Sequence, residues 1–222
     1  MSEAFSGFRP EAIDFLWQLR FNNNRDWFSA HKQTYLEALY RPLVAFSEEI
    51  FTPFAGRSGY CMKVSRIYRD ARFAHAAPYK ESLWLCIRRG ETYWGEEPSL
   101  FFEITPEGYN YGFVLWGPRA AWMQAFRARL AAKPEEFLAL CEDLRRKTGL
   151  ALTGDRYKRQ KPCPDARLAP WWNLKNLMAI SRHPVDDGLY DTSLPACVRE
   201  TLSALDPLYA WCQGFSANLS QT

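Results

Sequence analysis

A pair of strand-like segments around one turn constrains the fold of this chain most strongly. Ser99 to Thr105 and Tyr109 to Trp116 flank Pro106-Glu107-Gly108, a turn signal that predicts a β-hairpin. Both segments are apolar on both faces, whereas a strand with one solvated face would alternate apolar and polar residues. The hairpin is therefore expected at the centre of a sheet that is covered by helices.

Other strands of the same sheet are indicated by three further segments: Tyr60 to Tyr68, Ser82 to Arg88, and Asn176 to Ser181. The first of these alternates, and it puts Val64 and Tyr68 on one face. Arg66 shares that face, so it breaks the apolar pattern unless it meets an anion or a carboxylate. This expectation links the strand to a binding site.

Helical patterns precede and follow the strands. Pro10 suits the first turn of a helix, and apolar residues then recur at spacings of three and four as far as Leu19. Asn24 is a good N-cap for a second helix, which Pro42 kinks or restarts. Thr52 to Gly59 is expected to be a loop. Later helices are expected at three places: after Gly117-Pro118, from Glu135 to Lys147, and from Leu194 to Gln213.

This order of elements predicts an α+β protein. We expect a single domain over residues 1–222, with a mainly antiparallel sheet of five to six strands covered by amphipathic helices. Apolar residues make up 47% of the chain and aromatic residues 16%, which excludes a disordered protein. No stretch approaches the roughly 18 apolar residues of a membrane helix, and the N-terminus lacks a signal-peptide pattern. These features predict a cytoplasmic protein with no membrane partner.

No motif indicates a cofactor or a metal ion. The six cysteines have neither zinc-knuckle nor redox-motif spacing, so we expect reduced thiols that are mostly buried. Three scattered histidines and the lack of an acidic cluster argue against a metal site. The 12 glycines form no loop that would cradle a phosphate.

The net charge of +3 conceals two basic segments. Residues 57–89 hold eight Lys and Arg side chains against Asp70 and Glu81, a net charge of +6. Residues 156–182 hold seven against Asp165, which is again +6, so the rest of the chain carries −9. Two basic segments on an otherwise acidic chain could converge on one site. Convergence would place Arg66 or Arg72 within about 10 Å of the second segment, near one Debye length.

Cations of these segments are the candidate ligand-binding residues: Arg66, Arg69, Arg72, Lys80, Lys158, Arg159 and Lys175. The planar fork of Arg can hold carboxylate or phosphate oxygens two at a time. The competing interpretation is that Asp70, Glu81 and Glu103 pair with the first four cations and brace the loop against the sheet.

Three residues of the first segment are candidates for catalysis. Asp70 could act as a general base, although orienting Arg69 or Arg72 is the simpler role for it. His75 could be an acid or a base near neutral pH. Tyr79 could donate a phenol hydrogen bond, and a tyrosine half-buried in a sheet is the plainer interpretation.

Several of these pieces resemble a known bacterial family, the domain-of-unknown-function family numbered 2461, over about residues 8–210. The matching pieces are Asn23-Asn24-Arg25-Asp26-Trp27-Phe28, Pro42, Arg66-Ile-Tyr-Arg69-Asp70-Ala-Arg72-Phe73, Pro78-Tyr79-Lys80, Tyr109, Gly112, Lys158-Arg159 and Lys175. Ala74 to Ala77 departs from the polar linker usual in the family, and a Gly expected near Pro162 is missing. The resemblance implies the extent of the domain and the place of a site, but no reaction.

Three classes of function remain open on the sequence. The leading hypothesis is a basic pocket for a small anionic metabolite or nucleotide, with catalysis left open. The first alternative is a nucleic-acid-binding module that uses the same cations together with Trp171 and Trp172. The second is an interaction or structural protein in which the cluster only braces the fold. An extended basic surface would favour nucleic acid, a concave one a small anion, and fully paired arginines the structural role.

Overall fold

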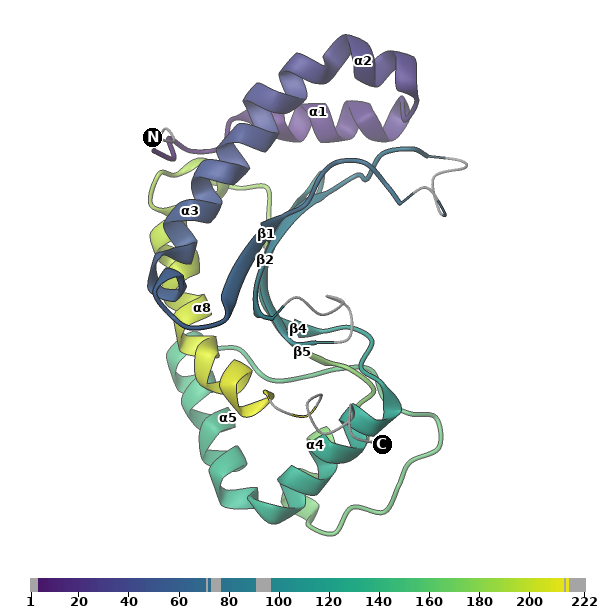
Figure 1. Cartoon of the computed structure of the whole chain (residues 1–222), viewed down its shortest axis with the longest axis vertical. Coiled ribbons are helices and arrows are strands. Elements are labelled where there is room, and N and C mark those ends of the chain that lie inside the picture. Colours follow the sequence, from purple (N-terminus) through teal and green to yellow (C-terminus); the bar gives the residue numbers. More distant parts are fainter. Residues whose placement is uncertain (1–3, 71, 73–76, 91–96, 214, 216–222) are drawn as a thin grey trace. The chain divides into compact units, whose positions relative to one another are not determined.

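The structure is a computed structural model that describes residues 4–70, 72, 77–90, 97–213 and 215 (Figure 1). These residues divide into two compact units. The first unit comprises Met1–Ile87, Phe102–Tyr111 and Arg182–Glu200, and the second comprises Arg88–Phe101, Gly112–Ser181 and Thr201–Thr222.

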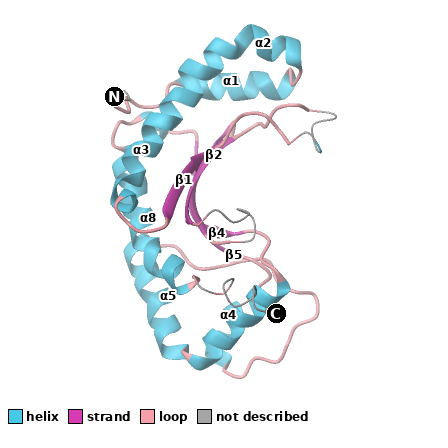
Figure 2. Ribbon diagram, viewed as in Figure 1, coloured by secondary structure: helices cyan, strands magenta, loops and turns pink. Residues whose placement is uncertain are grey.

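A five-stranded antiparallel sheet confirms the expected α+β class (Figure 2). Its strands pair in sequence order: β1 (Tyr60–Val64), β2 (Leu83–Arg89), β3 (Ser99–Thr105), β4 (Gly108–Leu115) and β5 (Leu177–Pro184). The hairpin is confirmed, because β3 and β4 are joined through Pro106 and Glu107. Seven of the eight residues of β4 are buried, as a central strand covered on both faces requires. The extent of the domain stays a prediction.

Close backbone packing fixes the register of β4 against β5. A Cβ atom at Gly108 would collide with the carbonyl oxygen of His183, and one at Gly112 with that of Ala179. From Gly108 to Gly112 the residue met on β5 moves back from His183 to Ala179, as the antiparallel arrangement requires. Gly112 also has a φ of +151°, which side chains rarely adopt, so glycine is required at this position.

The N-terminal helices of the first unit follow the sequence pattern closely. They are α1 (Pro10–Phe21), α2 (Arg25–Thr34), the π-helix η1 (Tyr35–Tyr40) and α3 (Arg41–Ala55). Asn24 is the N-cap of α2, because its side chain accepts a hydrogen bond of 2.9 Å from the amide of Trp27. The π-helical turn ends where Pro42 enters α3, since proline cannot donate the regular helical hydrogen bond.

Helix α3 is longer than expected, so the loop predicted from Thr52 was wrong. The helix continues to Ala55 with Pro53 inside its last turn. Phe54 is only 1% exposed, and its burial holds this turn in helical form. The loop begins at Gly56.

The three longer helices of the second unit lie where the sequence placed them, and its two short helices were not predicted. They are α4 (Ala120–Ala132), α5 (Pro134–Thr148), the short η3 (Ala166–Leu168) and α6 (Ala169–Trp172), and the second half of α8 (Leu194–Trp211). Gly149 ends α5 with a φ of 72°, the left-handed conformation typical of a helix C-terminus. Rings of Phe126, Phe137 and Trp211 meet within 6 Å of one another in the core.

Two remaining observations concern the whole described chain. Among the residues described, none of the helices is long and apolar enough to span a bilayer. The six cysteines, all described, form no disulfide with one another, and only Cys86 and Cys212 are buried, so the expectation of mostly buried thiols was wrong.

Candidate functional site

The first basic segment forms an extension of the β1–β2 pair, which we call the β1–β2 extension (residues 65–70 and 78–82). It is an antiparallel ribbon in which Tyr68 bridges Tyr79. The amide of Arg69 donates to Pro78 at 2.9 Å, and that of Lys80 donates to Ile67 at 2.8 Å. In Figure 1 the extension continues from β1 and β2 alongside α1 and α2 of the same unit.

A bulge in the partner strand of this ribbon lies opposite Arg66. Ser65 pairs with Trp84 and Ile67 pairs with Lys80, so Arg66 alone lies opposite three residues, 81–83. Ser65 and Ile67 are buried, whereas Arg66 and Tyr68 are exposed. Arg66 thus shares the face of Tyr68, as expected, but this face is exposed, so the position of Arg66 alone requires no anion.

Asn23 holds the free edge of the ribbon. Its side-chain oxygen accepts from the amide of Tyr79 at 3.0 Å, and its Nδ2 donates to the Tyr79 carbonyl at 3.0 Å. Residues 78 and 80 direct their backbone groups to the partner strand, so those of Tyr79 point outward. Asn23 thus replaces a neighbouring strand. The ring of Tyr79 stacks on Phe28 with centroids 4.1 Å apart.

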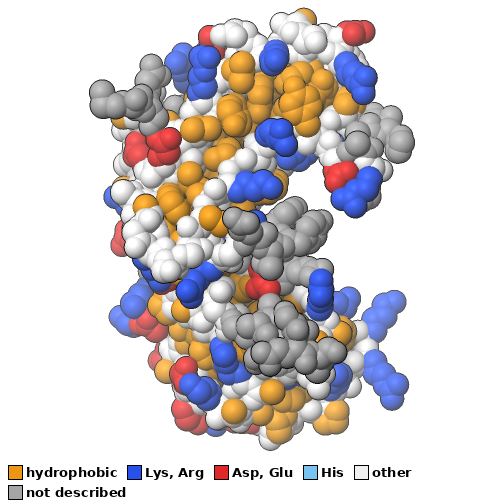
Figure 3. Space-filling model, viewed as in Figure 1, with side chains coloured by type: hydrophobic (Ala, Val, Ile, Leu, Met, Phe, Trp, Pro, Cys, Tyr) orange, Lys and Arg blue, Asp and Glu red, His pale blue; other side chains and the backbone are white. Residues whose placement is uncertain are grey.

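Four cations gather on this ribbon and on β1: Lys63, Arg66, Arg69 and Lys80. We call them the cation cluster. Lys80 is half-buried, and its Nζ lies 5.4 Å from the ring centre of Trp84. Burial lowers the pKa of Lys80, and the charges of Lys63, Arg66 and Arg69 lower it further. Figure 3 shows Lys and Arg side chains beside hydrophobic surface over this part of the first unit.

A hydrogen bond holds the Arg69 side chain, but not all of its N–H donors have an acceptor. Its Nη2 donates to the carbonyl of Tyr79 at 3.2 Å. Its Nε is buried and has no hydrogen-bond partner among the described residues. A buried guanidinium nitrogen without a protein acceptor leaves a hydrogen bond that water or an anion can complete.

Asp70 pairs with Arg72 rather than with Arg69. The carboxylate accepts from Arg72 Nη2 at 2.7 Å, from its Nε at 3.1 Å and from its amide at 3.0 Å. These hydrogen bonds lower the pKa of Asp70 to about 2. The two side chains are 46% and 71% exposed, so the pair contributes little to stability.

The other carboxylates expected as braces also have different partners. Glu81 accepts from Arg20 Nε at 2.6 Å, and Glu103 accepts from Ser82 at 2.8 Å. Among the described residues, no carboxylate pairs with any member of the cation cluster. The bracing interpretation therefore accounts for Arg72 and leaves the four clustered cations unexplained.

The catalytic candidates are dispersed. Asp70 is exposed and engaged by Arg72, while burial, followed by the neighbouring Tyr68, raises the pKa of Tyr79. His75 lies outside the described residues. Within the described chain, no group of three or more His, Cys, Asp or Glu side chains is placed to hold a metal ion. A catalytic role for these three residues stays a prediction.

The second basic segment, except Arg182, belongs to the second unit. Lys158, Arg159 and Lys175 are exposed there. Trp171 is half-buried, and its indole nitrogen donates to the carbonyl of Leu152 at 3.0 Å. Convergence of the two segments, and a role for these three cations, stay predictions.

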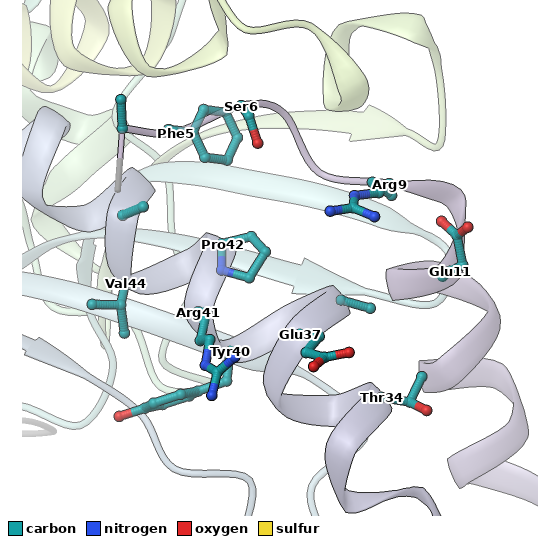
Figure 4. Close-up of a pocket in the computed structure, with 13 residues that line it drawn as sticks. Phe5, Ser6, Arg9, Glu11, Thr34, Glu37, Tyr40, Arg41, Pro42 and Val44 are labelled. Atoms are coloured by element: carbon teal, nitrogen blue, oxygen red, sulfur yellow. The ribbon is translucent and has the colours of Figure 1, made fainter. Parts of the chain in front are cut away.

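An open groove of about 610 Å³ lies elsewhere in the first unit, between the N-terminal segment and the η1–α3 helix (Figure 4). Its lining mixes Arg9 and Arg41 with Glu11 and Glu37, and it includes no member of the cation cluster. Because positive and negative side chains alternate along it, this groove does not select for an anion.

Sequence reasoning missed two residues of this region, Asn23 as an edge clamp and Lys63 as a member of the cluster. The pairing of Asn23 with a residue 56 positions away is visible only in three dimensions. No pattern in the sequence distinguishes Lys63, which is exposed, from Ser65 two residues later, which is buried.

Comparison with family models places the chain. The model of a family described as a conserved hypothetical protein (DUF2461) matches residues 11–211, and the chain belongs to this family. Neither the comparison with curated proteins nor the one with solved structures gave a match.

Proposed function

We propose that this member of the conserved hypothetical family binds a small anionic ligand, a phosphate or a carboxylate compound, at the cation cluster. The observation that carries the proposal is the absence of a described carboxylate partner for Lys63, Arg66, Arg69 and Lys80. Four like charges this close repel one another, and a bound anion would remove that repulsion. Such an unfavourable arrangement is common at functional sites.

Arg69 and Lys80 are the central ligand residues of this proposal. Arg69 is held by the carbonyl of Tyr79, which gives its guanidinium a fixed direction. Lys80 follows Tyr79 in the chain, and Asn23 clamps that backbone. The binding groups are thus positioned before the ligand arrives, which limits the entropy lost on binding.

Thermal unfolding with and without about 10 mM phosphate tests the proposal, at an ionic strength matched with chloride. A ligand at ~100 times its dissociation constant adds about 2.7 kcal/mol. For a chain of this length that corresponds to a rise of roughly 5–10 °C in the melting temperature. The Lys80→Met variant should lose this rise.

Lys32→Met is the matched control, because Lys32 is an exposed lysine on α2 of the same unit. It should respond to phosphate like the parent protein. Equal responses of parent, Lys80→Met and Lys32→Met would show that phosphate acts elsewhere, and the proposal would be wrong.

Nucleic acid is the second candidate ligand, and the exposure of the cations in the second basic segment favours it. Lys158, Arg159 and Lys175 lie on the surface without a carboxylate partner among the described residues. A duplex contact with about five phosphates would give a slope near −4.5 in log affinity against log salt. Binding of oligonucleotides with such a slope would favour this candidate over a small anion.

The proposal includes a location in the bacterial cytoplasm. The lack of a disulfide among the six described cysteines supports a reducing compartment, where disulfides are rare.

A further inference from the structure

Lys80 differs from every other lysine of the chain. All eight lysines are described, and seven of them are exposed, whereas Lys80 is half-buried. Two exposed ones, Lys133 and Lys147, pair with carboxylates at 2.7 and 2.6 Å. Lys80 has no hydrogen-bond acceptor or carboxylate for its amine among the described residues. Its amine is therefore unusually little stabilised in the charged form.

Neighbouring elements of the first unit supply the charged groups around this amine. Lys63 comes from β1, and Arg66 and Arg69 come from the β1–β2 extension. Two carboxylates belong to the same elements: Glu81 follows Lys80 in the chain and accepts from Arg20, and Glu103 on β3 accepts from Ser82.

The balance of these effects raises the neutral fraction of the Lys80 amine above that of an exposed lysine. Burial and the three cations lower the pKa of Lys80. The ring of Trp84 attracts the ammonium and offsets part of this effect. A lysine beside other cations is a known route to a nucleophilic amine at neutral pH.

We propose that Lys80 is a nucleophile that forms an imine with a carbonyl compound carrying a carboxylate or phosphate group. The inference rests on the proposed anion site, because Arg66 and Arg69 would hold the anionic group of the same compound. It adds a covalent step and names the substrate class.

The step is a condensation that releases one water molecule. The lone pair of Lys80 Nζ attacks the carbonyl carbon, which forms the C–N bond of a carbinolamine. The carbonyl oxygen then leaves as water with the two protons of the amine, and the C=N bond forms. No electrons are gained or lost, so the step needs no oxidant or reductant.

Reductive trapping tests this inference on the full chain. The protein is incubated at pH 7.5 with pyruvate and cyanoborohydride, and tryptic peptides are then analysed by mass spectrometry. We expect Lys80 to gain a carboxyethyl group faster than any exposed lysine, since a lowered pKa increases the fraction of neutral amine at this pH. Repeating the labelling with a phosphorylated aldehyde in place of pyruvate shows whether the site prefers a phosphate or a carboxylate group.

Three controls complete the test. Acetone, a neutral carbonyl compound, should not label Lys80 preferentially, because it lacks the anionic group. Lys80→Arg keeps the charge and should abolish labelling at this position. Arg69→Met should slow the labelling of Lys80 by tenfold or more. The comparison among the lysines of the parent protein needs no variant, so it stands even where a variant fails to fold.

The outcomes separate this inference from the proposed function. Labelling of Lys80 no faster than that of Lys32 would overturn the imine inference. If phosphate still stabilises the parent but not Lys80→Met, the anion site stands without the covalent step. If phosphate has no effect and Lys80 shows no preference, both are wrong.

Discussion

Replacing Asn23 with alanine tests whether this one side chain holds the β1–β2 extension. The variant loses two hydrogen bonds of 3.0 Å to the backbone of Tyr79. Each contributes about 1 kcal/mol net, and the Tyr79 amide is left without its acceptor, so we expect a loss of about 2–3 kcal/mol. The carbonyl of Tyr79 keeps Arg69 as a donor, which limits the loss.

Urea unfolding measures this loss as a change in the midpoint at constant slope. Asn22→Ala is the matched control, since Asn22 is an exposed neighbour whose Nδ2 donates only to its own helix at Gln18. That variant should lie within about 0.5 kcal/mol of the parent, as surface substitutions usually do. If Asn23→Ala is equally mild, the side chain does not hold the ribbon and the clamp argument is wrong.

Three other substitutions follow from the same structure. Gly112→Ala should destabilise by more than about 3 kcal/mol in urea unfolding, because the new Cβ meets the carbonyl of Ala179 in a strained conformation. In Arg72→Met, the pKa of Asp70, measured by NMR, should rise from about 2 towards about 3.9. In the parent protein, the stabilisation by the Asp70–Arg72 pair is present above about pH 4 and is lost as the pH falls to about 2. At pH 7, Lys80→Met should have a free energy of unfolding equal to that of the parent or higher. This difference should narrow as the pH rises towards about 10, because the unfolded parent binds more protons than the folded parent in that range, so the parent gains stability.

Much of the fold could be predicted from local chemistry. The hairpin at Pro106 and Glu107 and the N-cap of Asn24 each depend on neighbouring residues in the chain, so the sequence determines them. The π-helical turn before Pro42 follows from the missing proline N–H. These elements lie where the pattern placed them.

The errors have a common physical cause, which is tertiary packing. Arg66 shares a face with Tyr68 as the alternation requires, but whether that face is buried depends on what packs against it. Helix α3 extends past Pro53 because Phe54 is buried against the rest of the unit. Neither effect leaves a signal in the local sequence.

The candidate site was predicted in part. Arg69 and Lys80 were identified from their type and spacing. The structure adds that no described carboxylate pairs with either of them. The pairing of Asp70 with Arg72 could not be distinguished beforehand from pairing with Arg69, because both arginines are within two residues of the carboxylate.

The most direct test of the central claim is a phosphate titration followed by backbone amide chemical shifts. The account predicts saturable shifts concentrated on residues 63–69 and 78–84, which carry the cation cluster, and their loss in Arg69→Met. Shifts that saturate elsewhere in the chain would contradict the account. So would the absence of shifts up to about 10 mM phosphate, which is ~100 times a dissociation constant of about 0.1 mM.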